Sequence, residues 1–205
     1  MNLYPFGKAV SYAIVRCLFK LRYEGTENVP EGGGYIIACN HRCYFDPLLL
    51  AYRVPAQIRY IAKAELTRIP LLGFFLKRFG IIPVKRGEGD NIALSKAADL
   101  IQEGGILGIF PEGTRSKSGV PLRPRSGIAI IAGKTGADIL PAAVSFSGKL
   151  RFRSAITVRF GKMIPNSDLG IDLASPSTLR TASRLVMDKI IALTDKVPSP
   201  EEGAQ

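Results

Sequence analysis

The sequence predicts a single α/β domain whose mixed or mostly parallel sheet is covered by helices. Short apolar runs of strand length alternate with longer segments of helical periodicity, the order expected of an α/β domain. The 205 residues, of which 46% are hydrophobic, suffice for one compact core and are few for two domains. We therefore expect residues 1–205 to form one domain.

An amphipathic helix is predicted at the N-terminus. Between residues 8 and 21, apolar residues recur at helical spacing, with Lys8, Arg16 and Lys20 interrupting the pattern. We assign residues 1–22 to this helix, which either packs on the core or also touches lipid. Residues 198–205 are polar and are predicted to be disordered.

The remaining elements are predicted from apolar runs and from start and stop signals. Asp46-Pro47 signals a helix start, and Gly104-Gly105 ends the helix that Asp90 caps. Strands are expected at 35–39, 57–61, 80–84, 106–110, 138–145 and 155–160, and helices at 47–53, 90–103, 126–134 and 177–194.

The charge balance predicts an anionic partner. The chain has 28 Lys and Arg against 17 Asp and Glu, a formal charge of +11, which suits phospholipid, nucleic acid or a phosphorylated substrate. Aromatic residues are not interleaved with basic ones as in nucleic-acid-binding modules, so nucleic acid is not expected as a partner. No run of about 18 apolar residues occurs, and we expect the chain not to span a bilayer.

The three cysteines predict a reducing, cytosol-facing location. Cys17, Cys39 and Cys43 are an odd number and do not indicate a disulfide framework. Cys39 and Cys43 flank His41, but no second histidine or cysteine pair completes a tetrahedral shell. We therefore expect neither a metal site nor a bound cofactor.

His41, the only histidine, is the first candidate catalytic residue. It follows a predicted buried strand, and ligand sites form at strand ends in α/β sheets. On a continuous helix Asp46 would lie about 140° around from His41, so a turn must bring the two side chains together. Asp46 would then hold one ring nitrogen while the other accepts a proton from a substrate hydroxyl. A structural histidine, with Asp46 only a helix cap, is the alternative.

The chain lacks the G-x-S-x-G sequence that carries a serine nucleophile in α/β hydrolases. The expected nucleophile is therefore the substrate's own hydroxyl. For a nucleophile that the substrate supplies, the protein has to provide positioning and proton removal.

A second candidate site is the sequence F-P-E-G-T-R-S at residues 110–116, where another predicted strand ends. Gly113 permits close approach of a ligand to the backbone, and Arg115 offers a planar fork suited to phosphate. Glu112 and Thr114 would fix that fork, and amides near Gly113 would stabilise charge developing on oxygen. A turn with a solvated charge pair is the alternative.

A densely apolar segment at residues 69–76, with cations at its edges, is predicted to contact a membrane. Such a segment inserts apolar side chains among lipid tails while its cations meet anionic headgroups. A core helix is the alternative. The residues assigned to membrane contact are Arg68, Leu72, Phe74, Phe75, Lys77 and Arg78.

Four blocks resemble motifs of the glycerolipid acyltransferase family, in the family's order. Residues 40–47 resemble its N-H-x-x-x-x-D block, and residues 110–116 look like its F-P-E-G-T-R-S block. Residues 80–86 are similar to its second motif, although Lys85 stands where an acidic or small polar residue is common. Residues 139–144 look like its fourth motif, which contains proline.

This resemblance implies an activity and a set of site residues. Within the family, the chain length and residues 63–66 are most similar to bacterial 1-acylglycerol-3-phosphate acyltransferases, also called lysophosphatidate acyltransferases. The implied base is His41, with Asp46 as its partner. The implied acceptor-site residues are Lys63, Arg86, Glu112, Gly113, Thr114 and Arg115, with Lys63 and Arg86 holding the acceptor phosphate.

The implied reaction belongs to phospholipid synthesis. It moves a fatty acyl group from acyl-CoA or acyl carrier protein to lysophosphatidate and gives phosphatidic acid. The expected location is the cytoplasmic face of the cell membrane, where a peripheral or monotopic protein binds an anionic membrane surface. Glycerol 3-phosphate, another lysophospholipid or an amino-acid lipid is the alternative acceptor, and a basic nucleic-acid-binding protein is the alternative class.

Overall fold

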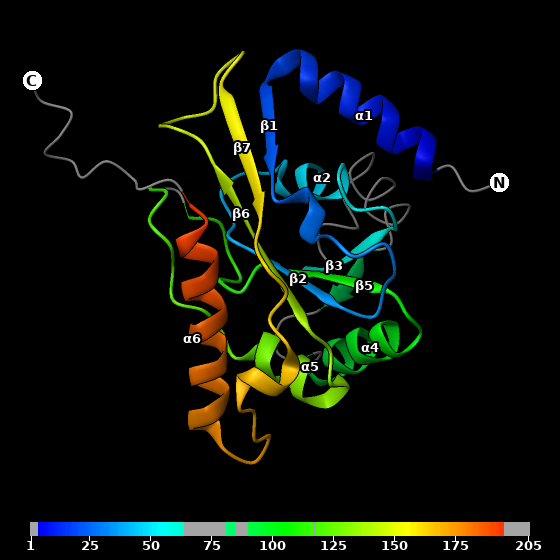
Figure 1. Ribbon diagram of the computed structural model, residues 1–205, viewed down its shortest axis with the longest axis vertical. Coiled ribbons are helices and arrows are strands. Elements are labelled where there is room, and N and C mark those ends of the chain that lie inside the picture. Colours follow the sequence, from blue (N-terminus) through cyan, green and yellow to red (C-terminus); the bar gives the residue numbers. More distant parts are fainter. Residues whose placement is uncertain (1–3, 64–80, 85–89, 117, 195–205) are drawn as a thin grey trace, which may run out of the picture.

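The computed structural model describes residues 4–63, 81–84, 90–116 and 118–194, which form one sheet with helices on both faces (Figure 1). The described sheet has seven strands in the order β1-β7-β6-β2-β5-β3-β4. Only β6 and β7 pair antiparallel, so the predicted mixed, mostly parallel sheet is confirmed. The strands are β1 (Lys20–Glu24), β2 (Ile36–Cys39), β3 (Ile58–Lys63), β4 (Ile82–Val84), β5 (Ile106–Ile109), β6 (Ile139–Ser145) and β7 (Ala155–Phe160).

The helices divide between the two faces of the sheet. Side chains of α4, α5 and α6 share one hydrophobic cluster with the sheet, while α1 and α2 share the other (Figure 1). The helices are α1 (Tyr4–Leu18), α2 (Asp46–Ala51), α4 (Asp90–Gln102), α5 (Gly127–Thr135) and α6 (Pro176–Ala192), with short 3-10 helices at Thr26–Asn28 and Asn166–Leu169.

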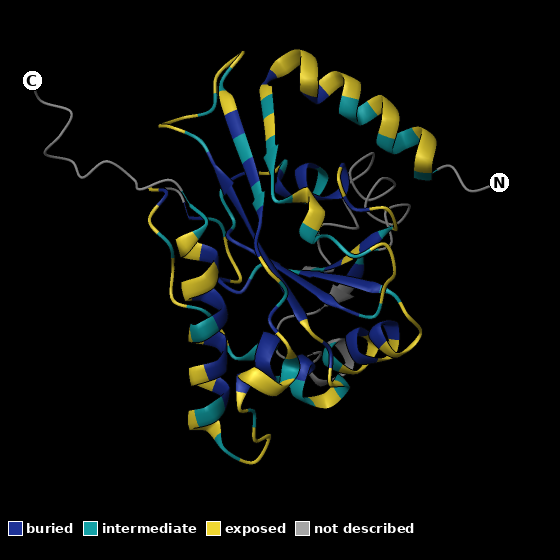
Figure 2. Cartoon of the chain, in the orientation of Figure 1, coloured by how far each residue is buried: buried dark blue, intermediate teal, exposed yellow. Residues whose placement is uncertain are grey.

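Strand β2 shows why the central strands are apolar throughout. Ile36 and Ala38 join the cluster under α4, α5 and α6, whereas Ile37 and Cys39 join the cluster under α1 and α2. All four residues are fully buried, as expected of a strand covered on both faces (Figure 2). The apolar run therefore leaves the polar residues that follow it at the edge of the sheet.

The N-terminal helix is shorter than predicted, because it ends at Leu18 and strand β1 follows. Residues 20–24 pair in parallel with β7, and Leu21 and Tyr23 pack against the core from alternate positions. Backbone pairing with a distant strand thus overrides the helical periodicity of residues 19–22. The alternating sequence Lys-Leu-Arg-Tyr-Glu is the period-two signal for this strand.

Candidate active site

The two candidate catalytic segments meet because β2 and β5 are parallel neighbours. Their register pairs Ile37 with Gly108 and Ala38 with Ile109. Parallel neighbours end at the same edge of a sheet, so the chain after Cys39 and the chain after Ile109 leave the sheet together. His41 and residues 110–116 are therefore brought to one place from sequence positions about 70 apart.

His41 and Asp46 form the predicted pair. The imidazole Nδ1 lies 2.7 Å from Asp46 Oδ2, and the Asp46 side chain is fully buried. The same carboxylate oxygen accepts hydrogen bonds from the backbone N–H groups of Arg42 (2.7 Å) and Cys43 (2.8 Å). The turn predicted between His41 and Asp46 is therefore present, and the carboxylate itself holds it closed.

Asp46 differs from the helix cap that the sequence suggested. Helix α2 begins at Asp46, Phe45 occupies the N-cap position, and no side chain caps the helix. The carboxylate turns back onto the preceding residues, where the Cys43 thiol donates to its other oxygen at 3.0 Å. Burial raises the pKa of the Cys43 thiol, and the Asp46 carboxylate raises it further, so this donor keeps its proton.

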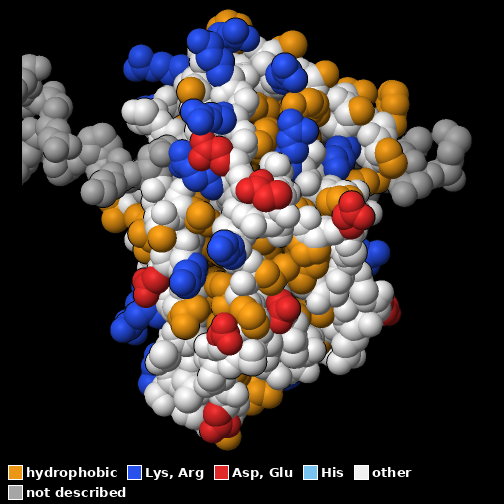
Figure 3. Space-filling model, in the orientation of Figure 1, with side chains coloured by type: hydrophobic (Ala, Val, Ile, Leu, Met, Phe, Trp, Pro, Cys, Tyr) orange, Lys and Arg blue, Asp and Glu red, His pale blue; other side chains and the backbone are white. Residues whose placement is uncertain are grey.

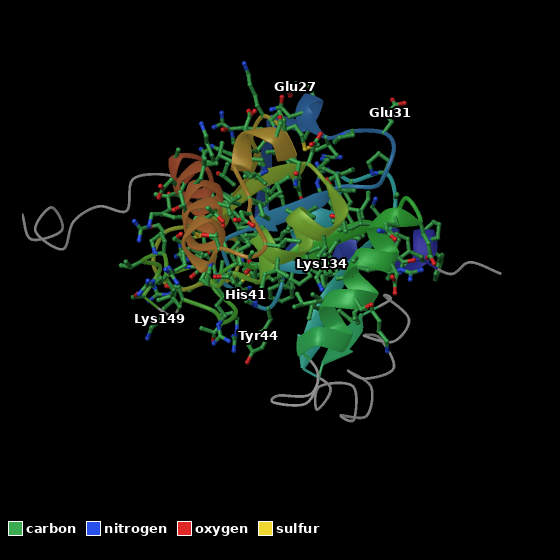
Figure 4. The ribbon with its side chains drawn as sticks, turned by 90° about the horizontal axis from the view of Figure 1, so that it is seen from below. Glu27, Glu31, His41, Tyr44, Lys134 and Lys149 are labelled. Carbon is green, nitrogen blue, oxygen red and sulfur yellow. The ribbon has the colours of Figure 1, made fainter. Side chains whose placement is uncertain are left out.

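Aromatic stacking fixes the face of the imidazole. The Phe110 ring stacks on His41 with centroids 4.1 Å apart, and Tyr60 also stacks on Phe110, with centroids 5.7 Å apart. Asp46 is at Nδ1 and Phe110 covers one face, while 20% of the His41 side chain remains exposed. No described residue hydrogen-bonds to Nε2, which leaves this nitrogen available to a substrate, and Tyr44 projects from the same region (Figure 4).

Glu112 connects the two segments and does not fix Arg115 as the sequence suggested. Its Oε1 accepts the backbone N–H of His41, and its Oε2 accepts that of Leu122, each at 3.0 Å. Only 3% of Glu112 is exposed. Burial raises the pKa of this carboxyl, and the two backbone hydrogen bonds oppose that rise. The structure thus gives Glu112 a positioning role. A second bond joins the same two segments, because the N–H of Ser116 donates to the His41 carbonyl at 2.8 Å.

Arg115 is held by Tyr44, a residue that sequence reasoning did not single out. Its guanidinium lies 3.6 Å from the centroid of the Tyr44 ring, and Nη2 donates to the Tyr44 hydroxyl at 2.9 Å. Tyr44 is 78% exposed and Arg115 is half-buried, so the cation reaches the surface beside Tyr44. A tyrosine between His41 and Asp46 is the only sequence signal of this contact.

Gly113 and Thr114 are exposed where residues 110–116 turn. Gly113 has a φ of +67°, which glycine adopts without strain, as the proposed close approach requires. Its amide donates to the Phe110 carbonyl at 2.9 Å. The Gly113 amide is therefore occupied in the turn, which differs from the suggested role in stabilising charge on oxygen.

Asn40 and Arg42 are two further residues whose roles sequence reasoning missed. Asn40 is buried and exchanges two hydrogen bonds with the backbone of Val144, at 2.8 and 3.0 Å, which ties the end of β2 to β6. The Arg42 guanidinium stacks on Phe146 and donates to its carbonyl. A polar residue directly after a buried strand was the available signal for Asn40.

Several predicted site residues lie outside the described structure. The backbone of Lys63 ends β3, but its side chain is not described. Among the described residues, no group of three or more potential metal ligands occurs, and no helix is long and apolar enough to cross a membrane. The other predicted site residues that lie outside the described residues are Arg86 and the predicted membrane-contact residues Arg68, Leu72, Phe74, Phe75, Lys77 and Arg78.

Comparison with known proteins decides the family. The acyltransferase family model matches residues 20–145, which include the His41–Asp46 pair and residues 110–116. The chain belongs to the acyltransferase family. The 1-acyl-sn-glycerol-3-phosphate acyltransferase of Bacillus subtilis is 33% identical over 175 residues, covering 83% of this chain and 86% of the relative.

Two more distant relatives bear on the fold and on the acceptor. The crystal structure of the 1-acyl-sn-glycerophosphate (LPA) acyltransferase of Thermotoga maritima has a similar fold, with a TM-score of 0.70 at 24% identity. That match covers 95% of this acyltransferase and 77% of the other chain. The lyso-ornithine lipid O-acyltransferase of Pseudomonas aeruginosa is 32% identical over 109 residues, which are 52% of this chain and 41% of that relative.

Replacing the Glu112 carboxylate by an amide tests its role as a hydrogen-bond acceptor. In Glu112→Gln, an N–H₂ group would face one of the two backbone N–H donors and leave it unsatisfied. We expect the free energy of unfolding, measured by urea titration, to fall by about 2 kcal/mol. Glu103→Gln removes the same charge at an exposed position and is the matched control. It should change the free energy of unfolding by less than ~0.5 kcal/mol. Equal effects in the two variants would contradict the positioning role.

Proposed function

We propose that this acyltransferase moves a fatty acyl group from a thioester donor to the free hydroxyl of 1-acylglycerol 3-phosphate, giving phosphatidic acid. The observation that carries the proposal is the His41 imidazole, whose Nδ1 lies 2.7 Å from a fully buried carboxylate while its opposite edge is open. The activity in the name of the Bacillus subtilis relative, which aligns with most of this chain, supports the choice of acceptor.

In this reaction His41 first accepts a proton and then returns it. As the acceptor hydroxyl attacks the thioester carbonyl carbon, its proton passes to Nε2 and a C–O bond forms. The tetrahedral intermediate then collapses, the C–S bond breaks, and the imidazolium returns the proton to the leaving sulfur. Asp46 accepts the Nδ1–H hydrogen bond, which orients the ring, and stabilises the imidazolium. No covalent enzyme intermediate is needed.

Arg115 is the described residue best placed to bind the acceptor's phosphate. It stands at the surface on Tyr44, and no described carboxylate forms an ion pair with it. A guanidinium presents parallel N–H groups that match phosphate oxygens. Lys63 and Arg86 stay in the proposal as further phosphate ligands on the family resemblance alone.

The exposed face of α1 supports peripheral binding to an anionic membrane. Phe6, Val10, Ile14 and Leu18 recur every fourth residue along α1 and are all exposed, Phe6 to 71%. Such a stripe lies flat in the interface between headgroups and acyl chains. Phe6 lies on the opposite side of the helix from Val15, which is buried in the core, whereas Leu18, three residues after Val15, lies closer to the buried face.

The connection between β6 and β7 extends this surface. Phe152 is 74% exposed there, and the N–H of Arg153 donates to the carbonyl of Leu18 at 2.6 Å, which joins the connection to the end of α1. Lys and Arg side chains are interspersed with hydrophobic ones over this end of the molecule (Figure 3). The exposed cations nearest in sequence are Arg16, Lys20, Lys149, Arg151 and Arg153. This combination suits anionic headgroups above apolar tails, and we propose the cytoplasmic face of the cell membrane as its place.

A lyso-ornithine lipid is the second candidate acceptor. The Pseudomonas aeruginosa relative named for that acceptor is 32% identical to half of this chain, so the same chemistry occurs on a phosphate-free lipid among its relatives. The His41 mechanism serves both acceptors, since each offers a hydroxyl. They differ in whether a phosphate ligand is needed.

His41→Ala tests the proposed base. Removing a general base should lower kcat for transfer from palmitoyl-CoA or palmitoyl-carrier protein to lysophosphatidate by at least about 10²-fold. The variant should keep its circular dichroism spectrum, because the imidazole is a partly exposed side chain and Asp46 retains its bonds to the Arg42 and Cys43 amides. Wild-type rates in a folded His41→Ala protein would rule out the mechanism.

Arg115→Ala separates the two acceptors. The KM for lysophosphatidate should rise about tenfold or more, because a charge-assisted phosphate contact is lost. The KM for lyso-ornithine lipid should not change. Arg59→Ala, which removes an exposed arginine from β3, is the matched control. A similar loss with both acceptors would remove Arg115 from the phosphate site.

The membrane surface is tested by Phe6→Asp/Ile14→Asp. This variant places two negative charges in the apolar stripe, and its binding to phosphatidylglycerol vesicles, measured by sedimentation, should fall at least about tenfold. Leu173→Asp/Ile191→Asp, at exposed apolar positions outside the stripe, should bind like the wild type. Unchanged binding of the α1 variant would exclude this surface as the contact.

A further inference from the structure

Four arginines surround a small pocket beside residues 110–116. Arg123 and Arg125 come from the segment before α5, and Arg180 and Arg184 lie one turn apart on α6. The pocket has a volume of ≈ 120 Å³ and is completed by Pro124 and Ser126. Sites for whole small molecules measure about 300 Å³ or more, so this pocket suits a single charged group.

The positive charge of this arginine pocket is not neutralised by any described carboxylate. None of the four guanidinium groups forms an ion pair in the described part of the chain. Arg180 and Arg184 repel each other at the i, i+4 spacing. Helix α5 also begins at the pocket, and its first turn has neither an acidic residue nor a side-chain cap at Ser126. An anion in the pocket would offset all of these positive charges.

The arginine pocket and His41 are connected through the turn at residues 110–113. The N–H of Arg125 donates to the Pro111 carbonyl at 2.9 Å, and its side chain packs so closely on Gly113 that a Cβ there would lie 2.8 Å from Nε. The Gly113 N–H bonds to the carbonyl of Phe110, whose ring stacks on His41. Arg125 and the His41 ring thus contact the same short segment, Arg125 at Pro111 and Gly113 and the imidazole at Phe110.

We propose that the arginine pocket binds the phosphate at the end of the acyl donor's phosphopantetheine arm. The proposal rests on the proposed function, because it takes the donor's thioester to react at His41. CoA and acyl carrier protein share this arm, and in both the phosphate is separated from the sulfur by the full length of pantetheine. When the thioester of either donor is at His41, its phosphate lies up to one pantetheine length away and needs a binding site of its own.

The acceptor's phosphate does not fit the arginine pocket. In lysophosphatidate the phosphate is on the glycerol carbon next to the reacting hydroxyl, so it must stay within a few bonds of His41. Arg115, which rests on Tyr44 in the turn between His41 and Asp46, is the cation proposed for that phosphate. The two sets of arginines thus divide between the two substrates, one for the acceptor and one for the donor.

The test compares three palmitoyl thioesters in Arg180→Gln/Arg184→Gln. These substitutions lie on α6, away from the residues assigned to catalysis and to the acceptor. With palmitoyl-CoA and palmitoyl-carrier protein, the KM of the donor should rise about tenfold or more with little change in kcat, because contacts to a charged group are lost. With S-palmitoyl pantetheine, which has no phosphate, the KM should not change. Lys134→Gln/Lys189→Gln removes two exposed cations outside the pocket and is the matched control.

The donors distinguish the source of the phosphate. A KM effect with both carriers supports recognition of the shared phosphate, and an effect with one carrier supports the proposal for that carrier. An equal effect with S-palmitoyl pantetheine, or none with any donor, would overturn it. So would an effect confined to lysophosphatidate or to vesicle binding, which would make the pocket a lipid headgroup site.

Binding of CoA to the intact protein, measured by calorimetry without acceptor, separates this proposal from the proposed function. Wild-type protein that binds CoA more tightly than Arg180→Gln/Arg184→Gln supports the pocket even where lysophosphatidate is not acylated. Acylation of lysophosphatidate with equal CoA and carrier-protein affinities in the two proteins would leave the proposed function standing and refute the pocket.

Discussion

The buried carboxylate of Asp46 is the group on which the catalytic geometry depends. A charge without solvent is costly unless hydrogen bonds satisfy it, and here two backbone amides, one thiol and one imidazole nitrogen surround it. These bonds hold the chain from His41 to Asp46 in a single turn, so the imidazole has one orientation. Stacking on Phe110 fixes the remaining rotation, and the open edge of the ring is left for chemistry.

Pairing of β2 with β5 connects this turn to the rest of the site. Glu112 bonds to the His41 amide and to Leu122, so one side chain sets the positions of the base and of the loop that carries the cations. From that loop Arg115 rests on Tyr44, and Arg125 packs against Gly113. The proposed reaction joins two anionic substrates, and the loop offers a separate cation for each.

The buried strands could be predicted because helices cover both faces of the sheet and leave long apolar runs. The pairing of His41 with Asp46 also followed from their spacing. Strand β1 was missed because its first residues also fit the helical spacing of the segment before them, and only its pairing with β7 makes the alternating pattern of residues 20–24 decisive. The partners of Glu112 and Arg115 depend on how two loops pack together, and spacing within one loop carries no information about that. Tyr44 and Asn40 were missed for the same reason.

The central claim is that Asp46 holds His41 with its proton on Nδ1 and its lone pair on Nε2. The chain has one histidine, so ¹⁵N NMR of the histidine-labelled protein observes this ring alone. At a pH where the ring is neutral, the account predicts a protonated Nδ1 and an unprotonated Nε2, with Asp46→Asn shifting the balance between tautomers. A ring with its proton on Nε2 would contradict the account, because it would have no base to offer the acceptor hydroxyl.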